Sequence, residues 1–199
     1  MRGHPNTLKP KPLDIFIVAE QFRYAGKFAT LIPALAAANP GWFDVARDLN
    51  MPTAAMVCAA FSLELYFKCL IRIGRKSYAG VHDLSKLFSM IGRRNQADIK
   101  RHWNDHCQQV KSHVARTFEE DGLPAPKVDF DYVLSASKDA FRTMRYIYEK
   151  GIDTHKGWLA DTVVEGARIA ILAKYPDWEN KRQISPLPKT SFQPTLPIL

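Results

Sequence analysis

The chain has few of the features that mark secreted proteins. Its 199 residues include three cysteines, Cys58, Cys69 and Cys107. An odd number of cysteines, each inside a helical pattern, argues against a disulfide framework and is typical of a reducing compartment. Residues 1–13 hold no apolar run of the kind that a secretory signal peptide requires. We therefore expect a cytoplasmic protein.

A long apolar run without charge is also missing. The most apolar stretch, residues 51–73, has enough residues to cross a membrane, but Glu64, Lys68 and Arg72 interrupt it. Each of these side chains would cost about 2.5–3.5 kcal/mol at the centre of a bilayer. We interpret the stretch as a buried core helix and expect no membrane contact.

The alternation of apolar and polar residues that indicates β-strands is absent. Apolar residues recur instead at three- and four-residue steps, which predicts helices over residues 14–32, 53–74, 82–91, 95–120, 131–150 and 161–175. Pro33 should bend or end the first helix. Asp83 is placed to cap the short third helix, whose buried face would be Leu84, Leu87 and Phe88.

These helices predict an all-α fold, most simply one bundle of four main helices with extra short helices. We expect the helical domain to span residues 14–175. Residues 1–13 and the Pro-rich tail 176–199 should be flexible, extended segments. A Pro-rich tail of this kind is also a candidate protein-binding segment.

Positive charge is concentrated in one part of the chain. The net charge is +8. The segment from Arg72 to Arg116 contains ten Lys and Arg residues and three Asp residues, so its own charge is +7. A localised basic region attracts polyanions, above all nucleic acid. The alternative is a solvated surface whose charge has no ligand. The candidate phosphate-binding residues are Arg72, Lys76, Arg93, Arg94, Lys100 and His102.

Three segments occur in a fixed order along the chain: "AAFSLELYFKCLIRIG" (59–74), "HDLSKLF" (82–88) and "AFRTMRYIYEK" (140–150). Together they resemble the HEPN domain superfamily, in which an "ELxxK" helix, a "HDLxxL" helix and a late "RYxYE" helix recur. The resemblance covers residues 14–150. It implies a helical bundle that forms homodimers and binds RNA or a nucleotide, with no cofactor or metal.

Some HEPN proteins are metal-independent endoribonucleases that carry an Arg followed, after four to six residues, by a His. The histidine would act as the base that activates the 2′-hydroxyl, and the guanidinium would hold the charged phosphate. Two pairs here match this spacing: Arg101 with His106, inside "RHWNDH", and Arg75 with His82. On a regular helix, Arg101 and His106 would point about 140° apart.

The position of these pairs differs from that in catalytic HEPN domains, where the motif lies at the start of the last bundle helix. In this chain that region holds Arg145, and the next histidine is His155, ten residues later. This departure favours binding without turnover over catalysis, and whether the chain is an enzyme stays open.

Three histidines of the 95–120 segment, His102, His106 and His113, would share one stripe of a continuous helix. The i, i+4 spacing of His102 and His106 could suit two metal ligands, but His113 lies about 10 Å along the axis from His106. No third or fourth ligand is evident. We therefore expect boundary histidines that form hydrogen bonds, and no metal site.

The core helix also carries a polar stripe at Glu64, Lys68, Arg72 and Arg75. One interpretation is a polar core seam of Glu64 and Lys68 with Arg145 and Glu149 of the late helix, which could also meet His82. The alternative is the solvent edge of the helix, where Glu64 and Lys68 form a pair that contributes a few tenths of a kcal/mol.

Three functions follow in order of preference. The first is an RNA- or nucleotide-binding regulatory module. The second is a metal-independent endoribonuclease of toxin or defence type. The third is a structural protein–protein interaction module whose positive charge has no ligand.

Overall fold

The structure is a computed structural model that describes residues 10–37, 52–78, 80–120, 122–137 and 161–181. Within these ranges the regular structure is helical and includes no strand, so the prediction of an all-α fold is confirmed. The helices are α1 (Pro12–Ala37), α3 (Pro52–Ile73), α4 (Leu84–Met90), α5 (Arg93–His106), α6 (Gln108–Glu120), α7 (Phe130–Ser137), α10 (Asp161–Leu172) and α11 (Trp178–Lys181).

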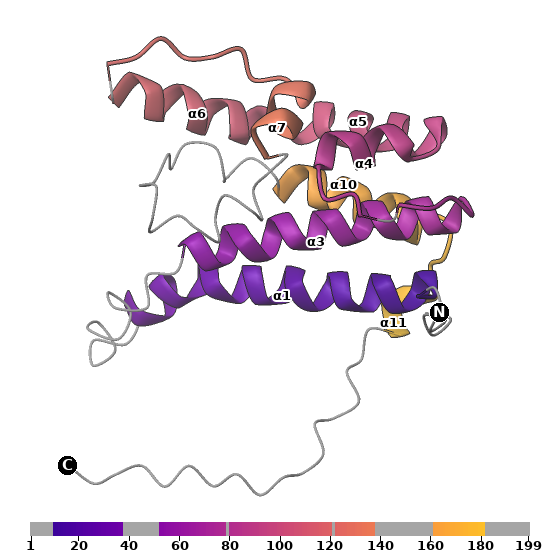
Figure 1. The fold of residues 1–199 in the computed structure, drawn as a ribbon. Helices are drawn as coiled ribbons and strands as arrows, with labels where there is room; N and C mark the ends of the chain where they lie inside the picture. The colour runs from indigo at the N-terminus through magenta and orange to yellow at the C-terminus, as the bar shows by residue number, and fades with distance from the viewer. Residues whose placement is uncertain (1–9, 38–51, 79, 121, 138–160, 182–199) are drawn as a thin grey trace, which may run out of the picture.

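Helix α3 lies between α1 and α10 (Figure 1). Helix α10 also packs against α5, and α4 contacts both α3 and α7. A helix with neighbours on several sides must be apolar on several faces. Between Ala54 and Ile73, α3 is long and apolar enough to cross a membrane, but 61% of the stretch is buried within the protein. Core helices of soluble proteins can have the same length and composition.

The core is built around large aromatic side chains. Phe16, Tyr66, Phe67 and Trp103 are almost completely shielded from solvent. The rings of Phe16 and Tyr66 lie 5.9 Å apart, and that of Phe16 lies 5.6 Å from Trp178. These contacts join α1, α3 and α11, and aromatic pairs at such distances stabilise a core beyond their buried area.

The prediction for the short helix α4 is confirmed. The carboxylate of Asp83 accepts a hydrogen bond of 2.9 Å from the main-chain N–H of Lys86, as an N-terminal cap should. Leu84, Leu87 and Phe88 are buried.

The prediction of one continuous helix over residues 95–120 is wrong. The chain leaves the helical path at Cys107, which has φ −75° and ψ −7°, and α5 and α6 are separate helices. The ring Nδ1 of His106 lies 2.9 Å from the carbonyl oxygen of His102. The ring of His106 therefore lies over the preceding turn of α5.

Two predicted boundaries also differ. Helix α1 continues through Pro33 to Ala37, so Pro33 does not end it. The tail does not become flexible at Pro176: α11 forms directly after it, and Trp178 is buried against Phe16 and Tyr175. The indole needs a partner surface, so the packed domain extends at least to Lys181.

Candidate functional site

A buried carboxylate lies at the centre of a group of polar residues near the end of α3. Glu64 is 1% exposed, and its Oε1 accepts a hydrogen bond of 2.6 Å from Lys68. The same oxygen lies 3.0 Å from Nδ1 of His82, in the loop that precedes α4. The ammonium of Lys68 lies 5.4 Å from the centre of the Tyr78 ring. The structure thus brings together Glu64, Lys68 and His82.

The contact with Glu64 orients the imidazole of His82. A carboxylate can only accept, so Nδ1 must donate, and in the neutral ring the lone pair then lies on Nε2. The side chain of His82 is 67% exposed, which leaves this nitrogen accessible to solvent. A buried carboxylate behind an accessible imidazole is an arrangement suited to proton transfer.

Arg75, the residue paired with His82 by spacing, has an unusual backbone. Its φ is +59°, in the left-handed region that glycine ordinarily occupies. Its N–H donates to the carbonyl of Arg72, and the N–H of Lys76 donates to that of Ile71. This pair of bonds closes α3 and leaves the Arg75 side chain exposed.

We define the basic end as Arg72, Arg75, Lys76, Arg93 and Arg94. The first three lie at the end of α3 and the last two at the start of α5. A bond of 3.0 Å from Nζ of Lys76 to the carbonyl of Met90, the last residue of α4, holds the first segment to the chain three positions before Arg93. Among the described residues, none of these five side chains pairs with a carboxylate. Nε of Arg72 is buried there without a hydrogen-bond partner.

Two other predicted cations have carboxylate partners. Nζ of Lys100 lies 3.3 Å from Asp131 and 5.2 Å from the centre of the Phe130 ring. The guanidinium of Arg101 lies 2.6 Å from Asp98. Both cations belong to α5, and their pairing leaves less positive charge for a ligand than the sequence indicated.

The structure does not join Arg101 to His106. Arg101 is exposed beside Asp98, whereas the ring of His106 stacks on His102 with 4.2 Å between the ring centres. Burial lowers the pKa of His102, and repulsion from His106 lowers it further, although Glu165 and Asp105 act in the opposite direction. His102 and His106 line a cavity of about 670 Å³, and none of the basic-end residues lines it.

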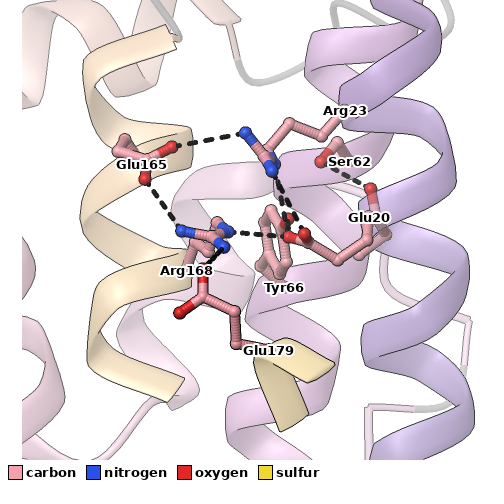
Figure 2. Close-up of polar contacts among 8 residues, drawn as sticks. Glu20, Arg23, Ser62, Tyr66, Glu165, Arg168 and Glu179 are labelled. Carbon is pink, nitrogen blue, oxygen red and sulfur yellow. Dashed lines mark hydrogen bonds and ion pairs between the residues drawn. The ribbon is translucent and has the colours of Figure 1, made fainter. Parts of the chain in front are cut away.

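Sequence reasoning missed a buried network of charges (Figure 2). Glu20 is 1% exposed and accepts bonds from Arg23 at 3.1 and 3.2 Å, from Arg168 at 2.9 Å and from the hydroxyl of Tyr66. Burial would raise the pKa of Glu20, but these donors and positive charges outweigh it, and the pKa is lowered. Burial and the contact with Glu20 raise the pKa of Tyr66.

The network joins four helices. Arg168 of α10 reaches Glu20 of α1 and Glu179 of α11, the latter at 2.8 Å, and Tyr66 belongs to α3. One signal was present in the sequence: Arg168 interrupts the apolar pattern of "VVEGARIAIL". A charge on a buried helix face requires a partner, but nothing in the spacing identified Glu20.

The remaining predicted site residues can be placed only in part. Arg145 and Glu149 lie outside the described residues, as does His155. His113 is exposed on α6, beyond the break at Cys107, and so does not continue the stack of His102 and His106. Across the ranges that the structure describes, no three His, Cys, Asp or Glu side chains are grouped to hold a metal ion.

Three comparisons with known proteins complete the description. No protein-family model, no curated protein and no solved structure matches this chain.

Proposed function

We propose that the chain is a HEPN-like module that binds RNA through the basic end and does not cleave it. The observation that carries this proposal is the set of cations at the adjoining ends of α3 and α5, which lack carboxylate partners among the described residues. Unpaired Lys and Arg side chains bind phosphates and release counterions from nucleic acid.

The resemblance in sequence supports the same place in the fold. Glu64 and Lys68 come from the segment similar to "ELxxK", and His82 comes from the segment similar to "HDLxxL". These residues meet at Glu64 Oε1, close in sequence to Arg72, Arg75 and Lys76. Residues of two separate motifs thus converge beside the basic end.

The test is the binding of a labelled single-stranded RNA, followed by fluorescence anisotropy. We expect Arg93→Ala/Arg94→Ala to weaken binding by about 10- to 100-fold, since each charged hydrogen bond contributes roughly 1 kcal/mol or more. Lys111→Ala/Arg116→Ala is the matched control, because it removes the same charge from exposed positions of α6. Equal weakening by both variants would contradict a localised site. Tight binding of a mononucleotide would point to a nucleotide ligand.

A second candidate function is metal-independent RNA cleavage, which the contact of His82 with Glu64 favours. His82 would accept the proton of the 2′-hydroxyl as its oxygen attacks phosphorus, and the bond from phosphorus to the 5′-oxygen would break as that oxygen takes up a proton from water. Cleavage in excess chelator that is lost in His82→Ala, but kept in His106→Ala and His113→Ala, would establish this activity. Binding without cleavage would support the first proposal.

Two further predictions concern the state of the protein. We propose that it is a cytoplasmic homodimer, as reduced cysteines and the resemblance to HEPN domains indicate. Sedimentation analysis would test the dimer, and fractionation of cells would test the location. A monomer at micromolar concentration would contradict the first of these.

A further inference from the structure

The cavity beside His102 and His106 is separate from the basic end. It is open to solvent and is lined by residues of α1, α3, α10, the end of α5 and the start of α6. Helix α5 has 14 residues, so Arg93 and His106 lie about 20 Å apart along its axis. A volume of about 670 Å³ falls within the range of small-molecule sites. A ligand here would not use the cations of the basic end.

One wall of the cavity offers hydrogen-bond acceptors. Nδ1 of His106 faces the carbonyl oxygen of His102, which can only accept, so this nitrogen carries the hydrogen and the lone pair of the neutral ring lies on Nε2. Asp105, Gln108 and Gln109 also line the cavity and are exposed. These side chains come from the break between α5 and α6.

The part of the lining that comes from α3 is apolar. Gly26 of α1 lies where a Cβ atom would stand 3.3 Å from the carbonyl oxygen of Ala55 and from Cβ of Cys58, so α1 and α3 approach closely. Ala55, Met56 and Ala59 of α3 line the cavity on this side. A flat apolar surface on a ligand would fit against such a wall.

The charges of the cavity do not favour a phosphate. Arg23 is already held by Glu20, and it lies 3.8 Å from Glu165. Lys27, the other cation of the lining, has an interaction of its own. Three carboxylates, of Asp105, Asp161 and Glu165, face these two cations, so the lining carries a formal charge of 2 − 3 = −1. An uncharged ligand with N–H donors suits this lining better than an anion.

We infer that this cavity binds an uncharged planar heterocycle that presents adjacent N–H donors along one edge, as guanine does. The carboxylate of Asp105 would accept two of these donors, and the apolar residues of α3 would pack against the flat face. The base could come from a free nucleoside or from an unpaired nucleotide of RNA, since both present the same edge.

Isothermal titration calorimetry with guanosine, inosine and guanosine monophosphate tests this inference. Inosine lacks the exocyclic amine and so one donor, and we expect it to bind roughly tenfold more weakly than guanosine. Guanosine monophosphate should bind no more tightly than guanosine. Asp105→Asn replaces one acceptor oxygen by a donor and should remove the preference for guanosine over inosine. Ala59→Phe should occupy the cavity and abolish binding.

The control is Arg93→Ala/Arg94→Ala, which should leave guanosine binding unchanged. Failure of wild-type protein to bind guanosine at millimolar concentration would overturn the inference. Tighter binding of the monophosphate than of guanosine would also overturn it. A third contrary result would be that the control variant loses guanosine binding while Asp105→Asn keeps the binding and the preference of the wild-type protein. These results are distinct from the RNA-binding test, which depends on the basic end.

Competition separates the two sources of the base. An RNA oligomer that contains guanine and displaces guanosine from the wild-type protein would identify an unpaired RNA base as the occupant. Absence of displacement would identify the free nucleoside. Both results support the cavity as a heterocycle site, because both require guanosine to bind there first.

Discussion

At the scale of single residues, the most consequential feature is a carboxylate buried among cations. The carboxylate of Glu20 accepts hydrogen bonds from Arg23, from Arg168 and from the hydroxyl of Tyr66. Charges removed from water are tolerated only when each has a partner, so the loss of one member is costlier than its own bonds suggest.

We expect Glu20→Gln to lower the free energy of unfolding by about 3–5 kcal/mol, because it leaves two buried guanidinium groups without their shared carboxylate. Urea denaturation would measure the change. Glu179→Gln is the control: its side chain is 47% exposed, and its loss should cost about 1 kcal/mol or less. A similar loss in the free energy of unfolding for both variants would show that the network is not the main interaction that holds α1 to α10.

The lowered pKa of His102 predicts a dependence of stability on pH. The pKa in the folded state lies below the ordinary value of 6.5, so between these two values the unfolded chain binds more protons. Stability should therefore be complete above 6.5 and fall as the pH decreases below it. His102→Gln cannot titrate and should lose less stability between about pH 6.5 and 5.

Arg75 is the residue at which stability and function should oppose each other. Its left-handed backbone conformation lowers the free energy of unfolding by about 1 kcal/mol relative to glycine, which adopts this conformation without strain. Arg75→Gly should therefore raise the free energy of unfolding by about this amount while it weakens RNA binding. Arg94→Gly would be the contrasting variant, since Arg94 lies in α5, where glycine destabilises a helix. A destabilised Arg75→Gly protein would contradict the conclusion that the backbone of Arg75 is strained.

At the scale of elements, the crossing of α5 and α10 depends on one glycine. A Cβ atom at Gly166 would stand 3.2 Å from Cδ2 of His102 and 3.4 Å from the carbonyl oxygen of Ile99. The absence of a side chain thus lets α10 approach α5 and places His102 against it. The position of His102 and His106 at the cavity follows from this approach.

We expect Gly166→Val to destabilise the protein by roughly 1–3 kcal/mol, because its methyl groups cannot fit between the helices. Ala97→Val is the matched control on the exposed face of α5, where the change should cost a few tenths of a kcal/mol. Thermal unfolding would compare the two variants. Equal midpoints would mean that the helices separate without cost.

At the scale of the whole molecule, the question is how a net charge of +8 is distributed. Carboxylates neutralise Lys100 and Arg101, whereas the basic end keeps its charge among the described residues. Localised charge predicts a binding constant that depends steeply on salt and on few side chains.

The logarithm of the RNA-binding constant should fall linearly with the logarithm of the salt concentration. For a single strand, each phosphate contact contributes about 0.7 to the slope, so Arg93→Ala/Arg94→Ala should reduce the slope by about 1.4. Titrations at several salt concentrations would measure it. An unchanged slope would place the phosphate contacts elsewhere on the molecule.

Much of the fold was predictable, because local patterns determine it. The period of apolar residues predicted α3 and α4 within a residue or two, and Asp83 identified the start of α4. The break at Cys107 was not predicted, since apolar residues continue on both sides of it and the bonds that accompany the turn, from His106 to the carbonyl of His102 and from Cys107 to that of Asn104, leave no trace in the apolar pattern. For the candidate sites, composition located the basic region but not which of its cations are paired.

The sequence by itself determined the helical class, the central place of the apolar helix α3 and the basic region, because periodicity and charge are properties of neighbouring residues. Only the tertiary structure decided which polar groups meet. Glu20 and Arg168 are 148 positions apart, His82 reaches Glu64 across a loop, and Arg101 and His106 diverge although they are close in the chain. The physical reason is that buried polar groups choose partners through the packing of whole helices, which no local spacing encodes.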